Sequence, residues 1–228
     1  MADERLLRAL AEQLKVPLLQ IARRAELGVS SADAAHLSHV QFVAETALSY
    51  VDAFLLSADR QTQALLKLEP VSVSSVLTDT AHQLEQFAKD HNCDVEVRLS
   101  GKYGPVMAHN ESLQSALLLL GYSLIEAQTP QDKRHQVILA AHRSSTGLVT
   151  GVFDNQAGLS TDVFRWGRAL YGDVRQPLPS ASSGAGAGIF IADTLLRSMS
   201  APLRVARHNS LTGLAATLHP SSQLQLVS

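Results

Sequence analysis

The stretch Ser182-Ser183-Gly184-Ala185-Gly186-Ala187-Gly188-Ile189-Phe190-Ile191 alternates glycine with alanine and then becomes apolar. Because glycine has no Cβ atom, a backbone here can approach a phosphate group closely. The apolar residues predict a helix at about 188–199, whose N-terminus offers unpaired N–H groups to an anion. Taken alone, the stretch is read equally well as a phosphate cradle or as a flexible loop. It is not a dinucleotide fingerprint, since no apolar strand precedes it, and no Lys-Ser/Thr pair makes it a P-loop.

Upstream, the first 60 residues carry two helical patterns. Apolar residues recur at spacings of three and four over residues 5–28, as on a helix with one buried stripe. Pro17 falls inside this pattern, and a helix that begins near Pro17 is the alternative. A start signal at residues 30–33 opens a second helix, whose heptad-like seam is Leu37, Val40, Ala44, Ala47, Val51, Phe54 and Ala58. Two helices cannot bury such seams on each other alone, so we expect a homodimer through residues 5–60 that forms a four-helix bundle.

The rest of the chain alternates between strand and helix patterns. In chain order we expect a strand at 71–73, a helix capped by Ser74 or Ser75, strands at 95–99 and 106–108, a helix at 110–127, strands at 136–142 and 147–153, the helix at 188–199, and strands at 203–206 and 214–218. Residues 155–183 lack periodicity, which is typical of a functional lid or of a disordered segment. This order predicts helices on one face of a mixed sheet, an α/β sandwich of the α+β class.

Composition narrows the class of protein. The formal net charge of −2 over 228 residues gives no electrostatic reason to expect a nucleic acid or an anionic membrane as partner. The single cysteine, Cys93, excludes an internal disulfide and fits a reducing compartment. No apolar run is long enough for a membrane span, and the acidic start at residues 1–4 argues against a signal peptide. We therefore expect a cytoplasmic protein. The histidines show no metal-ligand spacing, so no zinc site is expected.

Several motifs resemble those of the sensor histidine kinases. Residues 11–18, AEQLKVPL, resemble the H-box of that family, usually written HELRTPL, which is why Pro17 is kept inside the first helix. Residues 66–71, LKLEPV, resemble its linker into the ATP-binding domain. Residues 109–130 resemble the N-box helix, and residues 153–159, FDNQAGL, resemble the DxGxG motif. The glycine stretch at 184–189 resembles GxGxGL.

The resemblance covers nearly the whole chain and implies two domains. Residues 1–66 correspond to the dimerising, histidine-phosphotransfer-like hairpin, and residues 67–228 to an ATP-binding sandwich of the histidine kinase and gyrase type. It also implies an adenine nucleotide. Asp154 would accept a hydrogen bond from the adenine amino group, and Gly158 would let the backbone pass close to the base. The phosphates would lie on the cradle formed by Gly184, Gly186 and Gly188.

The N-box departs from the family pattern. Leu119 and Ser123 stand where the family has two asparagines, one for magnesium and one for the phosphates. A leucine cannot ligate a hard cation, so magnesium binding is doubtful and no metal-binding residue is expected, while Ser123 is retained as a candidate nucleotide contact. Glu126 stands where lysine is common, which predicts negative charge near the triphosphate.

The H-box departs further, because the phosphoacceptor histidine falls on Glu12. The resemblance therefore implies a pseudokinase of two-component signalling that could still bind ATP or ADP and that docks a response-regulator receiver domain or a partner kinase. Two alternatives stay open. One is a histidine phosphotransferase of a phosphorelay that uses His36 or His39, since imidazole is a suitable phosphoryl carrier at neutral pH. The other is an active kinase whose phosphoacceptor position has been altered.

Overall fold

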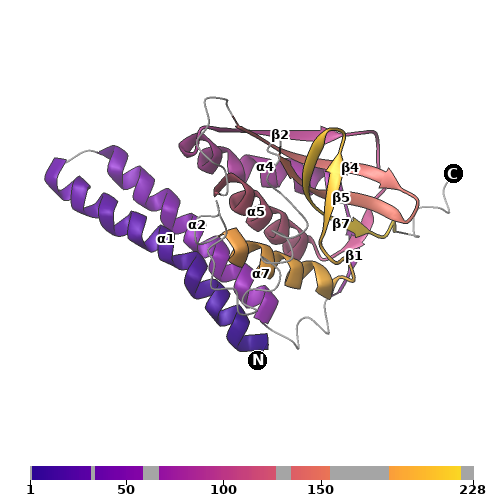
Figure 1. The fold of residues 1–228 in the computed structure, drawn as a ribbon, viewed down its shortest axis with the longest axis horizontal. Coiled ribbons are helices and arrows are strands. Elements are labelled where there is room, and N and C mark those ends of the chain that lie inside the picture. The colour runs from indigo at the N-terminus through magenta and orange to yellow at the C-terminus, as the bar shows by residue number, and fades with distance from the viewer. Residues whose placement is uncertain (1, 32–33, 59–66, 127–134, 155–184, 222–228) are drawn as a thin grey trace.

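The computed structural model describes residues 2–31, 34–58, 67–126, 135–154 and 185–221. Two long helices, α1 (Ala2–Ser31) and α2 (Ala34–Ala58), lie side by side as a hairpin (Figure 1). Pro17 lies within α1, so the prediction that the first helix continues through this proline is confirmed. Within the described ranges, no helix combines the length and the apolar character needed to cross a membrane.

The second part of the chain is a two-layer sandwich. Its helices are α4 (Val73–Asp90), α5 (Asn110–Glu126) and α7 (Ala185–Ser198). Its strands are β1 (Glu69–Val71), β2 (Cys93–Leu99), β3 (Val106–Ala108), β4 (His135–Ser144), β5 (Gly147–Asp154), β6 (Arg204–His208) and β7 (Leu211–Leu218). The main sheet has the order β2-β4-β5-β7-β6, in which β2 and β4 are parallel and the other pairs are antiparallel. A small sheet pairs β1 with β3. The predicted α+β class with a mixed sheet is confirmed.

The start of α4 differs from the expectation. The predicted strand at 71–73 ends at Val71, and the helix begins at Val73. Ser72, rather than Ser74 or Ser75, is the N-cap, and its hydroxyl accepts a hydrogen bond from the Ser75 N–H over 3.4 Å. Ser72, Ser74 and Ser75 each carry a hydroxyl of the kind that caps a helix. Because the side chain of Val73 is buried, Val73 is the first helical residue, and Ser72 before it becomes the N-cap.

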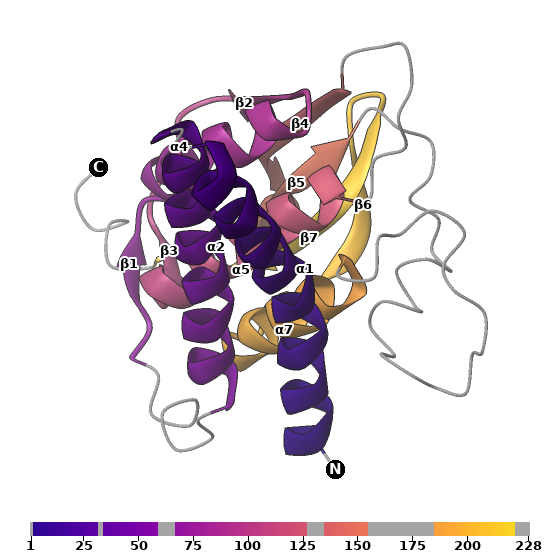
Figure 2. The ribbon, with the colours of Figure 1, turned by 90° about the vertical axis from the view of Figure 1, so that its left-hand side faces the viewer.

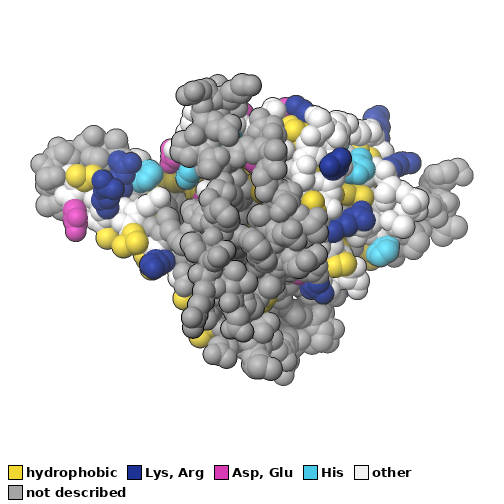
Figure 3. Space-filling view, in the orientation of Figure 1, with side chains coloured by type: hydrophobic (Ala, Val, Ile, Leu, Met, Phe, Trp, Pro, Cys, Tyr) yellow, Lys and Arg dark blue, Asp and Glu magenta, His cyan; other side chains and the backbone are white. Residues whose placement is uncertain are grey.

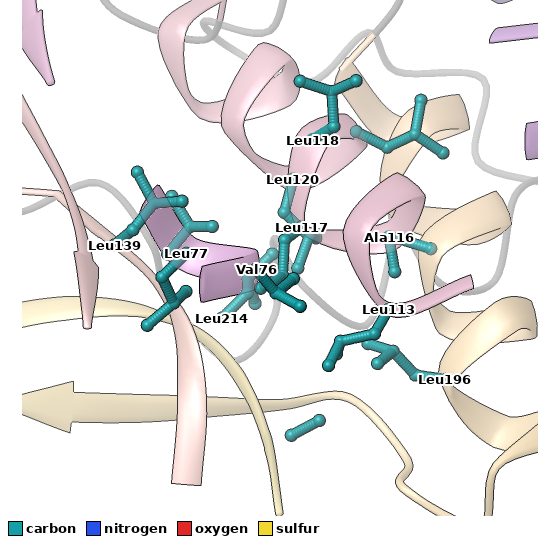
Figure 4. Close-up of a cluster of buried hydrophobic side chains, with 14 of the residues drawn as sticks. Val76, Leu77, Leu113, Ala116, Leu117, Leu118, Leu120, Leu139, Leu196 and Leu214 are labelled. Atoms are coloured by element: carbon teal, nitrogen blue, oxygen red, sulfur yellow. The ribbon is translucent and has the colours of Figure 1, made fainter. Parts of the chain in front are cut away.

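The core lies between the helices and the main sheet. Figure 4 shows it as a cluster of aliphatic side chains from α4, α5, α7, β4 and β7, which includes Val76, Leu77, Leu113, Leu117, Leu120, Leu139, Leu196 and Leu214. Almost every side chain of α5 from Leu113 to Ile125 is buried, because this helix has neighbours on several sides. A helix that is apolar all round is buried all round, which explains the run Leu117–Leu120.

The hairpin packs on the helix layer of the sandwich. Both α1 and α2 contact α7, and α2 also contacts α5 (Figure 2). The rings of Tyr50 on α2 and Tyr122 on α5 meet edge to face, with centroids 5.5 Å apart. The ring centroids of Phe42 on α2 and Phe87 on α4 are 6.5 Å apart, with the ring planes tilted by 43°. These contacts join the hairpin and the sandwich into one hydrophobic core.

This packing uses a different stripe of α2 from the seam that the sequence predicted. The buried residues are Val43, Thr46, Ala47, Tyr50, Ala53 and Ser57, of which only Ala47 belongs to the expected seam. The difference arises because the single chain already covers one side of α2 with its own sandwich. The predicted burial of the seam by a second copy of the chain stays a prediction.

The opposite face of the sheet is covered in part by the chain itself. Its cluster is formed by Ile138, Ala140, Val149, Phe153, Leu211 and Ala215. The Nδ1 atoms of His142 on β4 and His208 on β6 are 3.4 Å apart, although a flat sheet would separate these strands by about 14 Å. The β6–β7 hairpin therefore bends over the sheet (Figure 1). Gly213 of β7 lies close to its register partner Phe153 of β5, where a Cβ atom would be 2.6 Å from the Phe153 Cα atom.

Candidate nucleotide site

Asp154 is the last residue of β5, and its side chain is 5% exposed. It lies between Val137 of β4 and Thr212 of β7 in the sheet register. Leu148 and Val152 of the same strand belong to the core under the helices. Because side chains of a strand alternate between faces, Asp154 also points toward the helix layer. The carboxyl group therefore lies at one end of the sheet, on the inner face, where the resemblance requires an adenine acceptor.

The α5 helix supplies Leu119 and Ser123, which lie one turn apart and are each 1% exposed. Leu119 packs within the main hydrophobic core. The Ser123 hydroxyl oxygen is buried and has no hydrogen-bond partner in the part of the chain that the structure describes. Such a hydroxyl can accept or donate one bond to a ligand or a water molecule, whereas the leucine offers no ligand to a metal ion.

The predicted glycine cradle is only partly described. The α7 helix begins at Ala185, three residues before the expected start, so Gly186 and Gly188 lie in its first turn rather than in a loop. The alternating alanines favour helix, and the buried Ile189 and Ile191 hold this turn against the core. The N–H groups of a first helical turn have no partner within the helix, so an anion-binding role remains compatible with the earlier start. Gly184 and Gly158 lie outside the described residues.

Glu126 is the last residue of α5. The residue lines a cavity of about 630 Å³ between the hairpin and the sandwich. The expected charge near the triphosphate stays a prediction. Burial raises the pKa of the Glu126 carboxyl to about 7, against a smaller lowering by a hydrogen bond from Tyr50. The side chain is thus turned toward Tyr50 of α2, a relationship that no local sequence pattern reveals.

The residues considered for phosphoryl transfer lie on the hairpin. Glu12 lies within α1 and His36 within α2, and the side chains of both fall outside what the structure describes. His39 is described: its Nδ1 atom is 3.5 Å from an Asp90 carboxylate oxygen on α4, and its side chain is 24% exposed. His39 is therefore neither a cap nor fully solvent-facing, but part of the contact between hairpin and sandwich.

A metal centre has no support among the described side chains. No group of three or more histidine, cysteine, aspartate or glutamate residues in these ranges is arranged to hold a metal ion. The donors that a magnesium nucleotide needs are also not found at Leu119. Asp154 and Ser123 are hydrogen-bonding groups, whereas Leu119 offers no ligand to a metal ion.

Comparison with solved structures finds proteins of similar fold. No protein-family model and no curated protein matches the sequence. Among solved structures, the histidine kinase AdeS of Acinetobacter baumannii superposes with a TM-score of 0.55 at 11% identity, over 92% of this chain and 98% of that one. ShkA, solved in complex with AMPPNP, gives 0.53 at 17% identity over 96% of this chain and 46% of that chain. A structure described as a bacterial phosphotransferase gives 0.51 at 9% identity over 93% and 94% of the two chains.

Proposed function

Because the chain has the fold of the histidine kinases, we propose that it acts as a pseudokinase of two-component signalling. In this proposal it is a homodimeric scaffold that binds an adenine nucleotide and docks a receiver domain or a partner kinase. One observation carries the proposal: Leu119, where the resemblance requires a metal-holding asparagine, is a core side chain that is 1% exposed. The loss of the metal ligand is thus built into the packing of the domain.

Nucleotide binding is supported by what remains around that leucine. The Asp154 carboxyl is buried at the end of β5, on the inner face of the sheet, and the Ser123 hydroxyl is buried on α5, which packs against β5. Gly188 is a buried residue of the first turn of α7, and α7 packs against α5. The first turn of α7 offers N–H donors that favour an anionic phosphate. Together these groups favour a nucleotide held by hydrogen bonds, with little help from magnesium.

Dimerisation is supported by apolar residues that the single chain leaves exposed. Leu37, Leu48 and Leu55 of α2 are 68%, 60% and 58% exposed, and their spacings of 11 and 7 put them on one face of the helix. Leu7 and Leu18 of α1 are likewise exposed and 11 residues apart. An exposed leucine stripe on two adjacent helices favours a partner of the same kind, as in a four-helix bundle.

The test is a calorimetric titration of ADP into the wild-type protein and into Asp154→Asn, with Asp79→Asn as the control. Asp79 is an exposed aspartate of α4, far along the chain from the site. The amide keeps the shape of the carboxyl but weakens its acceptor for the adenine amino group, so we expect a loss of about tenfold in affinity. Equal affinity in Asp154→Asn and Asp79→Asn would contradict the proposed nucleotide site.

A second candidate, phosphoryl transfer through His39, is favoured by the neighbouring Asp90 carboxylate. A carboxylate that holds one ring nitrogen orients an imidazole and leaves the other nitrogen for attack on phosphorus. The test is incubation with a phosphorylated receiver domain, with His39→Gln compared to His82→Gln, an exposed histidine of α4. Phosphate that appears on the wild type but not on His39→Gln would favour this candidate over the pseudokinase.

A further inference from the structure

The cavity between the hairpin and the sandwich is lined by none of the residues assigned above to the nucleotide site. It has a volume of about 630 Å³, and its walls come from α1, α2, α4 and the end of α5. One part of the wall is apolar and aromatic: Pro17, Leu27, Phe42, Val43 and Phe87. The ring of His91 stacks on that of Phe87, with centroids 4.3 Å apart, and extends this flat surface. A volume of this size, lined in this way, suits a small organic molecule.

The charges in the wall favour an anion. Arg23 and Arg24 of α1 line the cavity, and Figure 3 shows Lys or Arg side chains next to His side chains where the hairpin meets the sandwich. The His39 Nδ1 atom lies 3.5 Å from an Asp90 carboxylate oxygen, so this acid of the wall already has a polar neighbour. Glu126 is the other acid of the wall, and burial raises its pKa to about 7, so near neutral pH it is protonated in a large part of the molecules. The lining therefore carries an excess of positive charge.

We propose that this cavity binds a small amphipathic anion, a carboxylate or phosphate attached to an aromatic or aliphatic body. The head group lies at the guanidinium groups of Arg23 and Arg24, because guanidinium forms paired hydrogen bonds with both kinds of anion. The body lies against Phe42 and Phe87. A ligand in this position touches both the hairpin and the sandwich, so it stabilises their packing and makes the arrangement of the two parts responsive to a metabolite.

The experiment uses 2-naphthoate as probe, with 2-naphthamide as its uncharged analogue and 2-naphthyl phosphate to compare the two head groups. Each is titrated into the full chain by calorimetry and followed by the shift in thermal midpoint. We expect one site per chain, binding of naphthoate or naphthyl phosphate below about 1 mM, and affinity for the amide lower by about tenfold or more. Equal affinity for naphthoate and naphthamide, or no binding of either anion at about 1 mM, would overturn the proposal.

Two variants locate the site. Arg23→Gln combined with Arg24→Gln removes the head-group contacts, and Arg207→Gln on β6, an exposed arginine outside the cavity, is the matched control. Gln20→Trp fills the cavity from an exposed rim position without touching the core. Both cavity variants are expected to lose anion binding while Arg207→Gln keeps it. Retained binding in Gln20→Trp would place the probe elsewhere and refute the proposal. ADP binding that survives in Gln20→Trp separates this cavity from the nucleotide site.

Discussion

Leu119 and Ser123 lie one turn apart on α5, each 1% exposed; Leu119 packs in the hydrophobic core, and the buried Ser123 hydroxyl has no hydrogen-bond partner among the described residues. In the histidine kinases that the sequence resembles, asparagines stand at both positions. We propose that this pair separates two roles that the two asparagines combine: the hydroxyl can still bond to a ligand, while the leucine stabilises the core and offers no ligand to a metal ion.

The first prediction concerns Leu119→Asn, which restores the asparagine of the family pattern. We expect the variant to lose about 2–4 kcal/mol of unfolding free energy and to gain no magnesium site, because an amide replaces a buried aliphatic side chain. Urea denaturation measures the loss, with Gln114→Asn on the same helix as control. A variant as stable as the control that binds nucleotide more tightly with magnesium would show that Leu119 faces the nucleotide instead of the core.

Ser123→Ala tests the unpaired hydroxyl. A buried hydroxyl without a partner costs free energy, so its removal should leave the nucleotide-free protein equally stable or more stable, by up to about 1 kcal/mol. The same variant should bind ADP more weakly, since the ligand loses one hydrogen bond. Ser115→Ala, on the same helix, serves as the reference in both assays. A clear loss of stability in Ser123→Ala alone would mean that the hydroxyl already has a partner in the protein.

Much of this architecture could be predicted from the sequence, because local patterns determine it. The alternation at 147–153 and the apolar run around Leu117–Leu120 are properties of single elements, and both were found in the structure as β5 and α5. The residues that depend on contacts between elements were not predictable. Glu126 turns toward Tyr50, a residue 76 positions earlier, and nothing in the sequence near either residue indicates that pairing.

The stripe of α2 that packs on the sandwich shows the same limit. A heptad pattern identifies apolar faces but does not say which face meets the chain's own sandwich and which is left for a partner. Val43 and Tyr50 lie beside the predicted seam, and only the aromatic partners Phe87 and Tyr122 on other helices give them their role. The aromatic residues at helical spacing on α2 were the sequence feature that could have indicated this packing.

Glu126→Gln is predicted to stabilise the protein at high pH. The folded-state pKa of about 7 lies above the ordinary value of 4.5, so the folded protein holds this proton more tightly than the unfolded chain. The stability from this group is complete below pH 4.5 and is lost as the pH rises toward 7. At pH 8 we expect the glutamine variant to be more stable than the wild type by about 2–3 kcal/mol, and near pH 4.5 to be equal. Glu45→Gln, at an exposed position of α2, should show no such pH dependence.

The titration of His208 is predicted to change stability in the opposite direction, so that the protein loses stability as the pH falls. Burial, together with repulsion from His142 and Arg98, lowers the pKa of His208, so the unfolded chain takes up this proton first as the pH falls. Stability from this group is complete above the ordinary histidine pKa of about 6.5 and decreases as the pH falls below it. His208→Asn should reduce the drop in urea midpoint between pH 7.5 and pH 5.5, whereas His219→Asn, at an exposed position, should leave it unchanged. An unchanged drop in His208→Asn would contradict the assignment.

The proposed dimer interface predicts the effect of charge on the exposed leucines of α2. Leu48→Glu combined with Leu55→Glu should convert a dimer into a monomer in sedimentation experiments, because four carboxylates would face one another across the two-fold axis. The fold of each chain should survive, since both side chains are exposed. Leu99→Glu, at the exposed end of β2, is the control and should remain dimeric. A double variant that stays dimeric would place the interface elsewhere.

The most direct test of the central claim is the affinity for ADP measured by calorimetry in EDTA and again with excess magnesium chloride. The account predicts binding of similar strength in both, because Asp154, Ser123 and the first turn of α7 hold the nucleotide and Leu119 offers nothing to the cation. An affinity that rises by more than about tenfold with magnesium would contradict this prediction and would favour an active kinase instead. Absence of binding in both would leave a docking scaffold without a nucleotide.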